Sequence, residues 1–180
     1  NNSESWKEAA RKALKGVCRV CRECDGETCI SGIPGMGGSG SVEAFRRNSR
    51  DLRHVEIIPS FIRPDHSGES AIKFLGKSWS SPIWIAPMTG VATNMNGFMG
   101  EIEFQKILME ISHELNIPYI AGDSASPERF MECAELVKNT AIPSLAIFKP
   151  RKDLKEIEKR IRIAEDAGFI GVGIDIDSIA

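Results

Sequence analysis

PIWIAPMTG, residues 82–90, is the stretch that decides the fold of this chain. Its apolar run ends abruptly in small, turn-forming residues, as a buried strand does where its carboxyl end opens onto a cleft. Three later segments repeat the pattern, and they are residues 117–122, 142–150 and 169–177. We therefore predict four buried strands whose loops meet at one common face.

Amphipathic helices separate the predicted strands. Apolar residues spaced three and four apart predict a helix over about residues 101–115. Ser126 is the predicted N-cap of a second helix, with Pro127 in its first turn. Asp153 opens a third helix with a variant of the capping box, and Gly168 ends it. The order of elements therefore predicts consecutive βα units.

Alternating βα units form a parallel sheet, either open and doubly wound or closed into a barrel. An open dinucleotide-binding sheet carries a glycine fingerprint after its first strand, and residues 86–90 lack it. A closed eightfold barrel takes about 250 residues, whereas this chain has 180. The predicted fold is α/β, the first half of a (β/α)8 TIM barrel. Residues 42–180 form its first four βα units, and residues 1–41 form a helical, cysteine-containing extension.

Shorter elements are predicted before the barrel strands. Helices are expected over residues 5–14 and 42–52. An extended piece at residues 71–75 is expected to turn at Gly76 and Lys77 into a second short strand, which makes a β-hairpin.

The charge balance and the lengths of the apolar runs disfavour some classes of partner. The chain has 23 Lys and Arg against 25 Asp and Glu, a net charge of −2, which disfavours a general nucleic-acid binder. No run approaches the roughly 18 apolar residues of a membrane span, and the first residues lack the pattern of a secretory signal. We expect a soluble, cytoplasmic protein that acts on a small molecule, without a nucleic-acid or membrane partner.

Four of the five cysteines lie close together near the start of the chain. The three-residue steps between the first three resemble the start of a ferredoxin-type iron–sulfur ligand run, and zinc accepts the same thiolates. Free thiols or disulfides are the alternative. The fifth, Cys133, is predicted to lie in the core, on the buried stripe of the second helix. The predicted metal ligands are Cys18, Cys21, Cys24 and Cys29.

Two parts of the sequence carry a family resemblance. Residues 74–77, followed by 82–90, resemble the opening of FMN-dependent (β/α)8 enzymes, both the α-hydroxy-acid oxidase/dehydrogenase family and the type-two isopentenyl-diphosphate isomerases. Residues 164–169, followed by 173–177, are more similar to the α-hydroxy-acid branch. The resemblance covers about residues 41–180.

The resemblance implies FMN as the cofactor. In the family the loop after the first strand lies against the reactive edge of the flavin, where the backbone must approach closely. The loop after the second strand supplies a small or hydroxyl-bearing contact. An ordinary turn and a helix cap are the alternatives for these loops. The matching residues are Ala86, Pro87, Met88 and Thr89 in the first loop, with Gly122 and Ser124 in the second.

The third and fourth strands carry charged residues at their ends. The family usually has a glutamine and a tyrosine after the third strand, and Ala146 and Phe148 occupy those places. Lys149 follows directly, and it either offers charge to the flavin or substrate or stays solvated. On the fourth strand Asp175 matches a flavin contact, and Asp177 matches an aspartate that orients the catalytic histidine. Both point to the same side of a strand, where they are costly unless paired; capping the next helix is the alternative for Asp177.

The resemblance thus implies an FMN-dependent oxidoreductase that transfers a hydride from a 2-hydroxy acid to the flavin. In the family the base histidine, the catalytic lysine, the substrate-binding arginine and the phosphate site lie on later strands, so we expect this chain to be incomplete. The alternatives are an isopentenyl-diphosphate isomerase-like flavoenzyme and a non-enzymatic, metal-stabilised half-barrel that self-associates through its edges. The expected partner is a second copy in a homo-oligomer, or a complementing C-terminal half.

Overall fold

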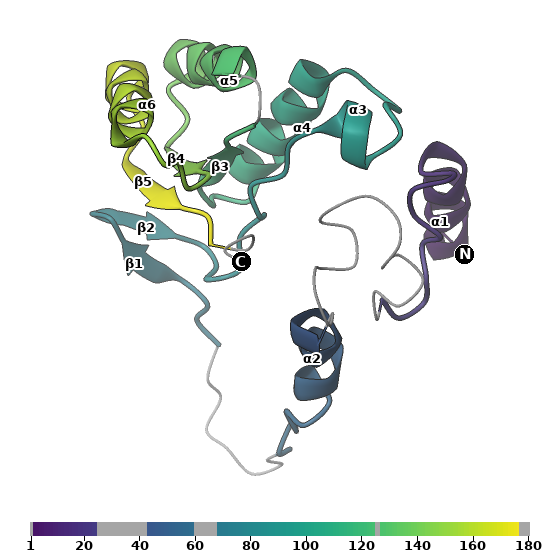
Figure 1. Ribbon diagram of the computed structural model, residues 1–180. Coiled ribbons are helices and arrows are strands. Elements are labelled where there is room, and N and C mark those ends of the chain that lie inside the picture. The colour runs from purple at the N-terminus through teal and green to yellow at the C-terminus, as the bar shows by residue number, and fades with distance from the viewer. Residues whose placement is uncertain (1, 25–42, 60–67, 125–126, 177–180) are drawn as a thin grey trace. The chain divides into compact units, whose positions relative to one another are not determined.

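The computed structural model describes residues 2–24, 43–59, 68–124 and 127–176 (Figure 1). They form two compact units. The first comprises residues 1–68 and 90–99, and the second comprises residues 69–89 and 100–180. The candidate functional residues after residue 68 all fall in the second unit.

The first unit contains the helices α1 (Asn2–Ala13), α2 (Glu43–Leu52) and the short α3 (Val91–Asn94). The helices predicted at residues 5–14 and 42–52 are confirmed. Within this unit, the side chain of Asn96 donates a hydrogen bond to the carbonyl oxygen of Ala13 over 3.2 Å. No helix in the described part of the chain has both the length and the apolar character needed to cross a membrane.

The second unit is built on a parallel sheet of β3 (Tyr119–Gly122), β4 (Ser144–Phe148) and β5 (Gly171–Ile174), paired in that order. The helices α4 (Glu101–Glu114), α5 (Pro127–Thr140) and α6 (Leu154–Ala167) alternate with these strands. All three helices lie on one side of the sheet (Figure 1). The last three predicted strands, their parallel pairing and the three helices are confirmed.

Local sequence signals set the ends of α6. The side chain of Asp153 accepts a hydrogen bond from the backbone N–H of Lys155 over 3.0 Å, as an N-cap does. Gly168 follows the helix with φ +83°, a left-handed conformation that glycine adopts without steric cost. Both were predicted. The predicted N-cap of α5, Ser126, lies outside the described residues.

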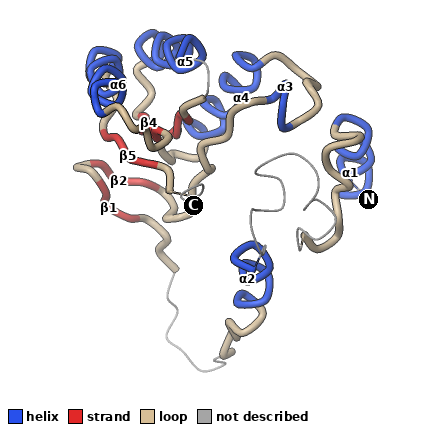
Figure 2. Tube along the Cα trace, in the orientation of Figure 1, coloured by secondary structure: helices blue, strands red, loops and turns tan. Residues whose placement is uncertain are grey.

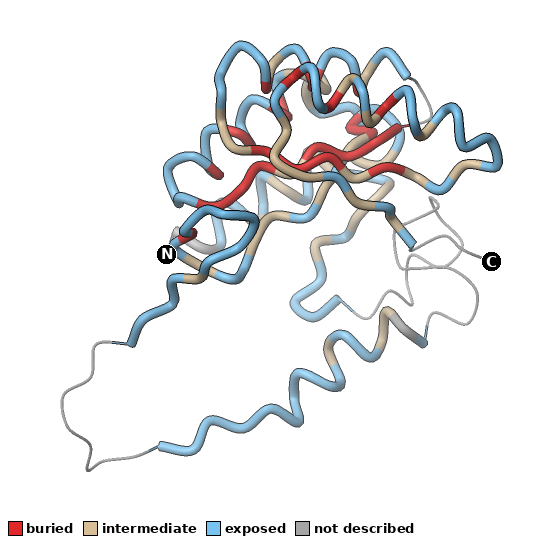
Figure 3. Tube along the Cα trace, turned by 90° about the vertical axis from the view of Figure 1, so that its left-hand side faces the viewer, coloured by how far each residue is buried: buried red, intermediate tan, exposed pale blue. Residues whose placement is uncertain are grey.

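The core lies between the three helices and the sheet (Figure 3). Phe130 of α5 meets Phe148 of β4 edge to face, with ring centroids 5.2 Å apart, an arrangement that aromatic pairs prefer. Cys133 is buried on the same face of α5, as predicted. Because strand residues alternate between the two faces of a sheet, Ala146 and Phe148 point toward the helices, and Leu145 and Ile147 point to the opposite side.

Residues 82–90 correct one prediction, since no strand is formed there and Ile83 is 80% exposed (Figure 2). Pro82 and Pro87 have no N–H group to donate to a ladder. The segment nevertheless runs beside the end of β3, because a Cβ built on Gly122 would lie 3.2 Å from the carbonyl oxygen of Pro87. The described parallel sheet therefore has three strands instead of the four expected.

A β-hairpin lies on the side of the sheet opposite to the helices (Figure 1). Its strands are β1 (Ile72–Phe74) and β2 (Lys77–Trp79), with Phe74 paired to Lys77. The turn is Leu75-Gly76, one residue earlier than predicted. Both residues have positive φ, +50° and +72°, as the type I′ turn of a tight hairpin requires.

Candidate functional site

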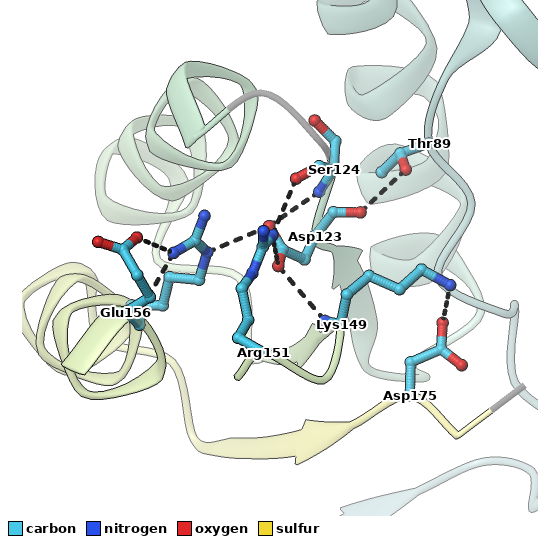
Figure 4. Close-up of polar contacts among 8 residues, drawn as sticks. Thr89, Asp123, Ser124, Lys149, Arg151, Glu156 and Asp175 are labelled. Atoms are coloured by element: carbon cyan, nitrogen blue, oxygen red, sulfur yellow. Dashed lines mark hydrogen bonds and ion pairs between the residues drawn. The ribbon is translucent and has the colours of Figure 1, made fainter. Parts of the chain in front are cut away.

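The carboxyl ends of β3, β4 and β5 bring four predicted site residues to one edge of the sheet (Figure 4). Ser124 follows β3, Lys149 follows β4 and Asp175 follows β5. Thr89 joins them from the preceding segment, since its hydroxyl donates to the carbonyl oxygen of Asp123 over 3.2 Å. This is the common face that the pattern of apolar runs predicts.

Lys149 and Asp175 form an ion pair across this edge. The ammonium nitrogen of Lys149 lies 2.5 Å from a carboxylate oxygen of Asp175, and the two side chains are 40% and 22% exposed. Lys149 comes two residues after Ile147, so the two side chains point to the same face of the sheet. Both charged groups therefore lie on the face turned away from the helices. The expectation that Asp175 needs a partner is met, and Lys149 supplies it. Asp177 lies outside the described residues.

Asp123 is a charged residue that sequence reasoning missed. Its carboxylate is fully buried and lies 2.6 Å from the guanidinium of Arg151 and 3.3 Å from that of Arg160. It also accepts hydrogen bonds from the backbone N–H groups of Ser124 and Lys149. A buried carboxylate is stable only when it is paired and hydrogen-bonded in this way. Asp123 thus links the loops after β3 and β4 to helix α6.

Arg160 shows the signal that would have identified this cluster. It lies on the apolar face of α6, three residues after Ile157 and four before Ala164, and it is 3% exposed. Burial lowers its pKa, but hydrogen bonds and charge from Glu156 and Asp123 outweigh burial, so the pKa of Arg160 is raised. An arginine within an apolar stripe predicts a buried carboxylate partner.

Gly122 and the loop at residues 86–89 fit closely together. A Cβ on Gly122 would lie 3.0 Å from the methyl group of Thr89 and 3.2 Å from the carbonyl oxygen of Pro87. A methyl group at these distances would be tightly packed, so the loop would have to give way by a few tenths of an ångström. The side chain of Met88 is 41% exposed. Glycine at position 122 thus allows the loop to reach the edge of β3.

The places assigned to the family's glutamine and tyrosine lie on the side of the sheet that faces the helices. Ala146 and Phe148 are fully buried against the helices. Because they point away from the face that carries Lys149 and Asp175, polar side chains here would not reach a ligand on that face.

The cysteine cluster gives no support for a metal site in the part of the chain that is described. Cys18 is half-buried, and its sulfur accepts a hydrogen bond from the N–H of Val20 over 3.3 Å. Cys21 and Cys24 are exposed. No group of three or more His, Cys, Asp or Glu side chains among the described residues is placed to hold a metal ion. Cys29 lies outside these residues.

Comparison with known proteins places this geometry in context. The family model of FMN-dependent dehydrogenases matches residues 35–180. An L-lactate oxidase of Lysinibacillus sphaericus (strain C3-41) is 24% identical over 142 residues, which are 79% of this chain and 34% of that protein. The chain thus spans about a third of the length of this relative.

Two solved structures share the fold. One is described as a lactate oxidase of Pediococcus acidilactici, with a TM-score of 0.61 and 17% identity over 97% of this chain and 43% of that chain. The other is a mandelate oxidase with 3,3-difluoro-2-hydroxy-3-phenylpropionic acid, with a TM-score of 0.62 and 22% identity over 97% of this chain and 46% of that chain.

Proposed function

Because the chain belongs to the FMN-dependent dehydrogenase family, we propose that it forms the flavin-binding part of an enzyme that oxidises a 2-hydroxy acid. The similarity to L-lactate oxidase supports this substrate class. In the proposed reaction the carbon that bears the hydroxyl group would give up a hydride, for which FMN would be the acceptor, and a base would take the hydroxyl proton. The product is a 2-oxo acid.

We also propose that the second unit is the first part of a (β/α)8 barrel. The parallel order β3-β4-β5, with helices on one side only, supports this, since a barrel turns the other side of its sheet inward. The similarity to the solved oxidases along nearly the whole chain gives further support. On this proposal, residues 82–89 take the place next to β3.

The observation that carries the proposal is the meeting of the 86–89 loop and the Lys149–Asp175 ion pair at one edge of the sheet (Figure 4). Their chemistry fits a flavin ring. Gly122 lets the loop pack closely against the end of β3, so that its backbone stands at this edge, and the ammonium of Lys149 would offer positive charge to a flavin bound there. FMN, when bound, supplies the hydride acceptor.

The proposal gives each of the candidate site residues a role. The loop residues and Ser124 position the ring, Lys149 provides the positive charge, and Asp175 fixes the direction of the lysine side chain. Asp177 keeps its proposed task of orienting the base. The groups that should hold the cofactor are Ala86, Pro87, Met88, Thr89, Gly122, Ser124, Lys149 and Asp175.

The test uses the protein at its natural length. The purified protein is loaded with FMN, freed of excess flavin, and mixed without oxygen with L-lactate or mandelate. We expect a yellow protein whose visible flavin absorbance is lost on mixing, together with formation of the 2-oxo acid. A protein that does not retain FMN contradicts the proposal, and one that stays yellow with a range of 2-hydroxy acids contradicts the substrate class.

A further inference from the structure

A buried chain of hydrogen bonds connects helix α4 to the 86–89 loop. Gln105 of α4 is fully buried. Its amide nitrogen lies 2.9 Å from the carbonyl oxygen of Met88 and 3.1 Å from a carboxylate oxygen of Glu101. Its amide oxygen accepts a hydrogen bond from the hydroxyl of Tyr119 over 2.7 Å. The chain therefore runs from the start of β3, through α4, to the loop.

The orientation of the Gln105 amide follows from its partners. The carbonyl oxygen of Met88 only accepts hydrogen bonds, so the NH₂ group must face it. The amide oxygen then faces Tyr119, whose hydroxyl can donate. Both sides of the amide are satisfied, and a buried amide that lost either partner would carry a desolvation penalty. The side chain of Gln105 is therefore fixed in one rotamer, with its amide group in one orientation.

Holding the Met88 carbonyl also fixes the next peptide group. Cis peptide bonds are absent from the described residues, and in a planar trans peptide the carbonyl and the following N–H point in opposite directions. Since Gln105 draws the carbonyl of Met88 toward the helix, the direction of the Thr89 N–H is set as well. The hydroxyl of Thr89, bound to the carbonyl of Asp123, holds the next position of the loop.

We propose that Gln105, held in place by Tyr119, is a positioning residue that orients the 86–89 backbone for the flavin. This rests on the proposed function, because it assigns Gln105 to the same site. Gln105 touches neither flavin nor substrate on this proposal; it acts through the peptide between Met88 and Thr89. Packing alone does not account for a fully buried glutamine on α4, whereas this role does.

The first test needs no flavin. Gln105→Met keeps the length of the side chain and removes its three hydrogen bonds. Ser112→Ala is the matched control, since Ser112 is also buried on α4. Hydrogen exchange is measured on the flavin-free proteins. We expect Gln105→Met to speed exchange at residues 88–90 about tenfold relative to the amides of β4, because local opening becomes easier. Exchange in this loop that is unchanged relative to β4 would overturn the proposal.

A second variant keeps the test decisive if Gln105→Met does not fold. Tyr119→Phe removes only the hydroxyl that fixes the amide oxygen, and we expect the same direction with a smaller effect, about threefold. Unchanged loop exchange in a folded Tyr119→Phe protein would equally contradict the proposal.

The flavin arm separates this inference from the proposed function. FMN should bind about tenfold more weakly to Gln105→Met than to the wild type, whereas Ser112→Ala should match the wild type. Unaltered FMN affinity in Gln105→Met would contradict the positioning role. A wild-type protein that fails to bind FMN would instead contradict the proposed function, and the exchange result would still decide whether Gln105 holds the loop.

Discussion

At the scale of single residues, the two carboxylates of the edge serve different purposes because they lie on different faces of the sheet. Asp123 points toward the helices, where two arginines surround it. Asp175 lies on the other face, paired with the partly exposed Lys149. Breaking a buried pair leaves an uncompensated charge, whereas an exposed pair contributes little to folding. Asp123 should therefore affect stability, and Lys149 should affect ligand binding.

Lys149→Met should weaken FMN binding about tenfold, the effect of losing one charge-assisted contact. The free energy of unfolding should change by less than about 1 kcal/mol, since the pair is partly exposed. Fluorescence titration with FMN and urea unfolding measure the two quantities. Lys152→Met is the control, because Lys152 is exposed nearby and should leave both values unchanged. Equal FMN affinity in the two variants would show that Lys149 does not belong to the FMN site.

Asp123→Asn should lower the free energy of unfolding by about 3–5 kcal/mol, since two arginines would face a neutral amide in a buried place. Urea unfolding followed by circular dichroism measures this loss. Asp166→Asn, an exposed position on α6, should cost under about 0.5 kcal/mol. Similar losses of unfolding free energy in both variants would show that Asp123 contributes no more to stability than an exposed aspartate.

Cys133 predicts a dependence of stability on alkaline pH. Burial raises the pKa of its thiol to about 11, from an ordinary value near 9. The folded state therefore holds the proton more tightly than the unfolded state, so this contribution is complete below pH 9 and is lost as the pH rises toward 11. Burial also raises the pKa of Tyr119, which adds a loss in the same direction at higher pH.

The expected size for Cys133 is roughly 2–3 kcal/mol, because each pKa unit corresponds to about 1.4 kcal/mol. Urea unfolding at a series of pH values from 8 to 11 measures it. Cys133→Ala should show a shallower decline over this range, whatever its stability at pH 8. An identical slope in the variant would contradict the assignment to the thiol.

At the scale of elements, the close approach of the 86–89 loop to β3 depends on the absence of a side chain at position 122. The loop is held from two directions, by Gln105 of α4 through the Met88 carbonyl and by Asp123 through the Thr89 hydroxyl. A loop held at both points cannot move aside without losing a hydrogen bond. A small change at β3 should therefore shift the 86–89 loop, which belongs to the proposed flavin site.

Gly122→Ala should displace this loop, since its new methyl group would lie 3.0 Å from Thr89 and 3.2 Å from the Pro87 carbonyl. We expect a loss of about 1–3 kcal/mol in the free energy of unfolding, the usual range for overpacking, together with weaker FMN binding. Gly100→Ala is the control, because its added methyl group would meet nothing closer than 3.9 Å. Retention of full FMN affinity in Gly122→Ala would show that the loop does not contact the flavin.

At the scale of the whole molecule, the candidate site belongs to one of the two compact units. A ligand that binds only the folded form stabilises it by an amount set by its concentration relative to Kd. FMN should therefore stabilise the second unit, which contains Thr89, Lys149 and Asp175, without a matching effect on the first.

Free FMN at one hundred times its Kd should raise the free energy of unfolding of the second unit by about 2.7 kcal/mol. Hydrogen exchange resolves the two units, and protection should rise in β3, β4 and β5 while α1 and α2 exchange at the same rate. Riboflavin without the phosphate is an informative comparison, because it tests the ring contacts alone. Equal protection in both units would place the flavin site elsewhere.

The sequence by itself determined the features that depend on neighbouring residues. The caps of α6 at Asp153 and Gly168, the apolar stripes of three helices, the existence of the hairpin and the parallel order of β3, β4 and β5 all follow from local chemistry and period. The meeting of Thr89, Ser124, Lys149 and Asp175 follows too, because parallel strands end at one edge.

Only the tertiary structure decided which residues pair with one another through ion pairs and hydrogen bonds. Asp123 meets Arg160, and Gln105 meets Met88 and Tyr119, only after helices pack on the sheet. It also decided that residues 82–90 form no ladder, since a strand needs a hydrogen-bonding neighbour as well as a suitable sequence. The physical reason is the same in each case: a buried polar group is stable only with its partner, and the identity of a partner far along the chain is set by packing.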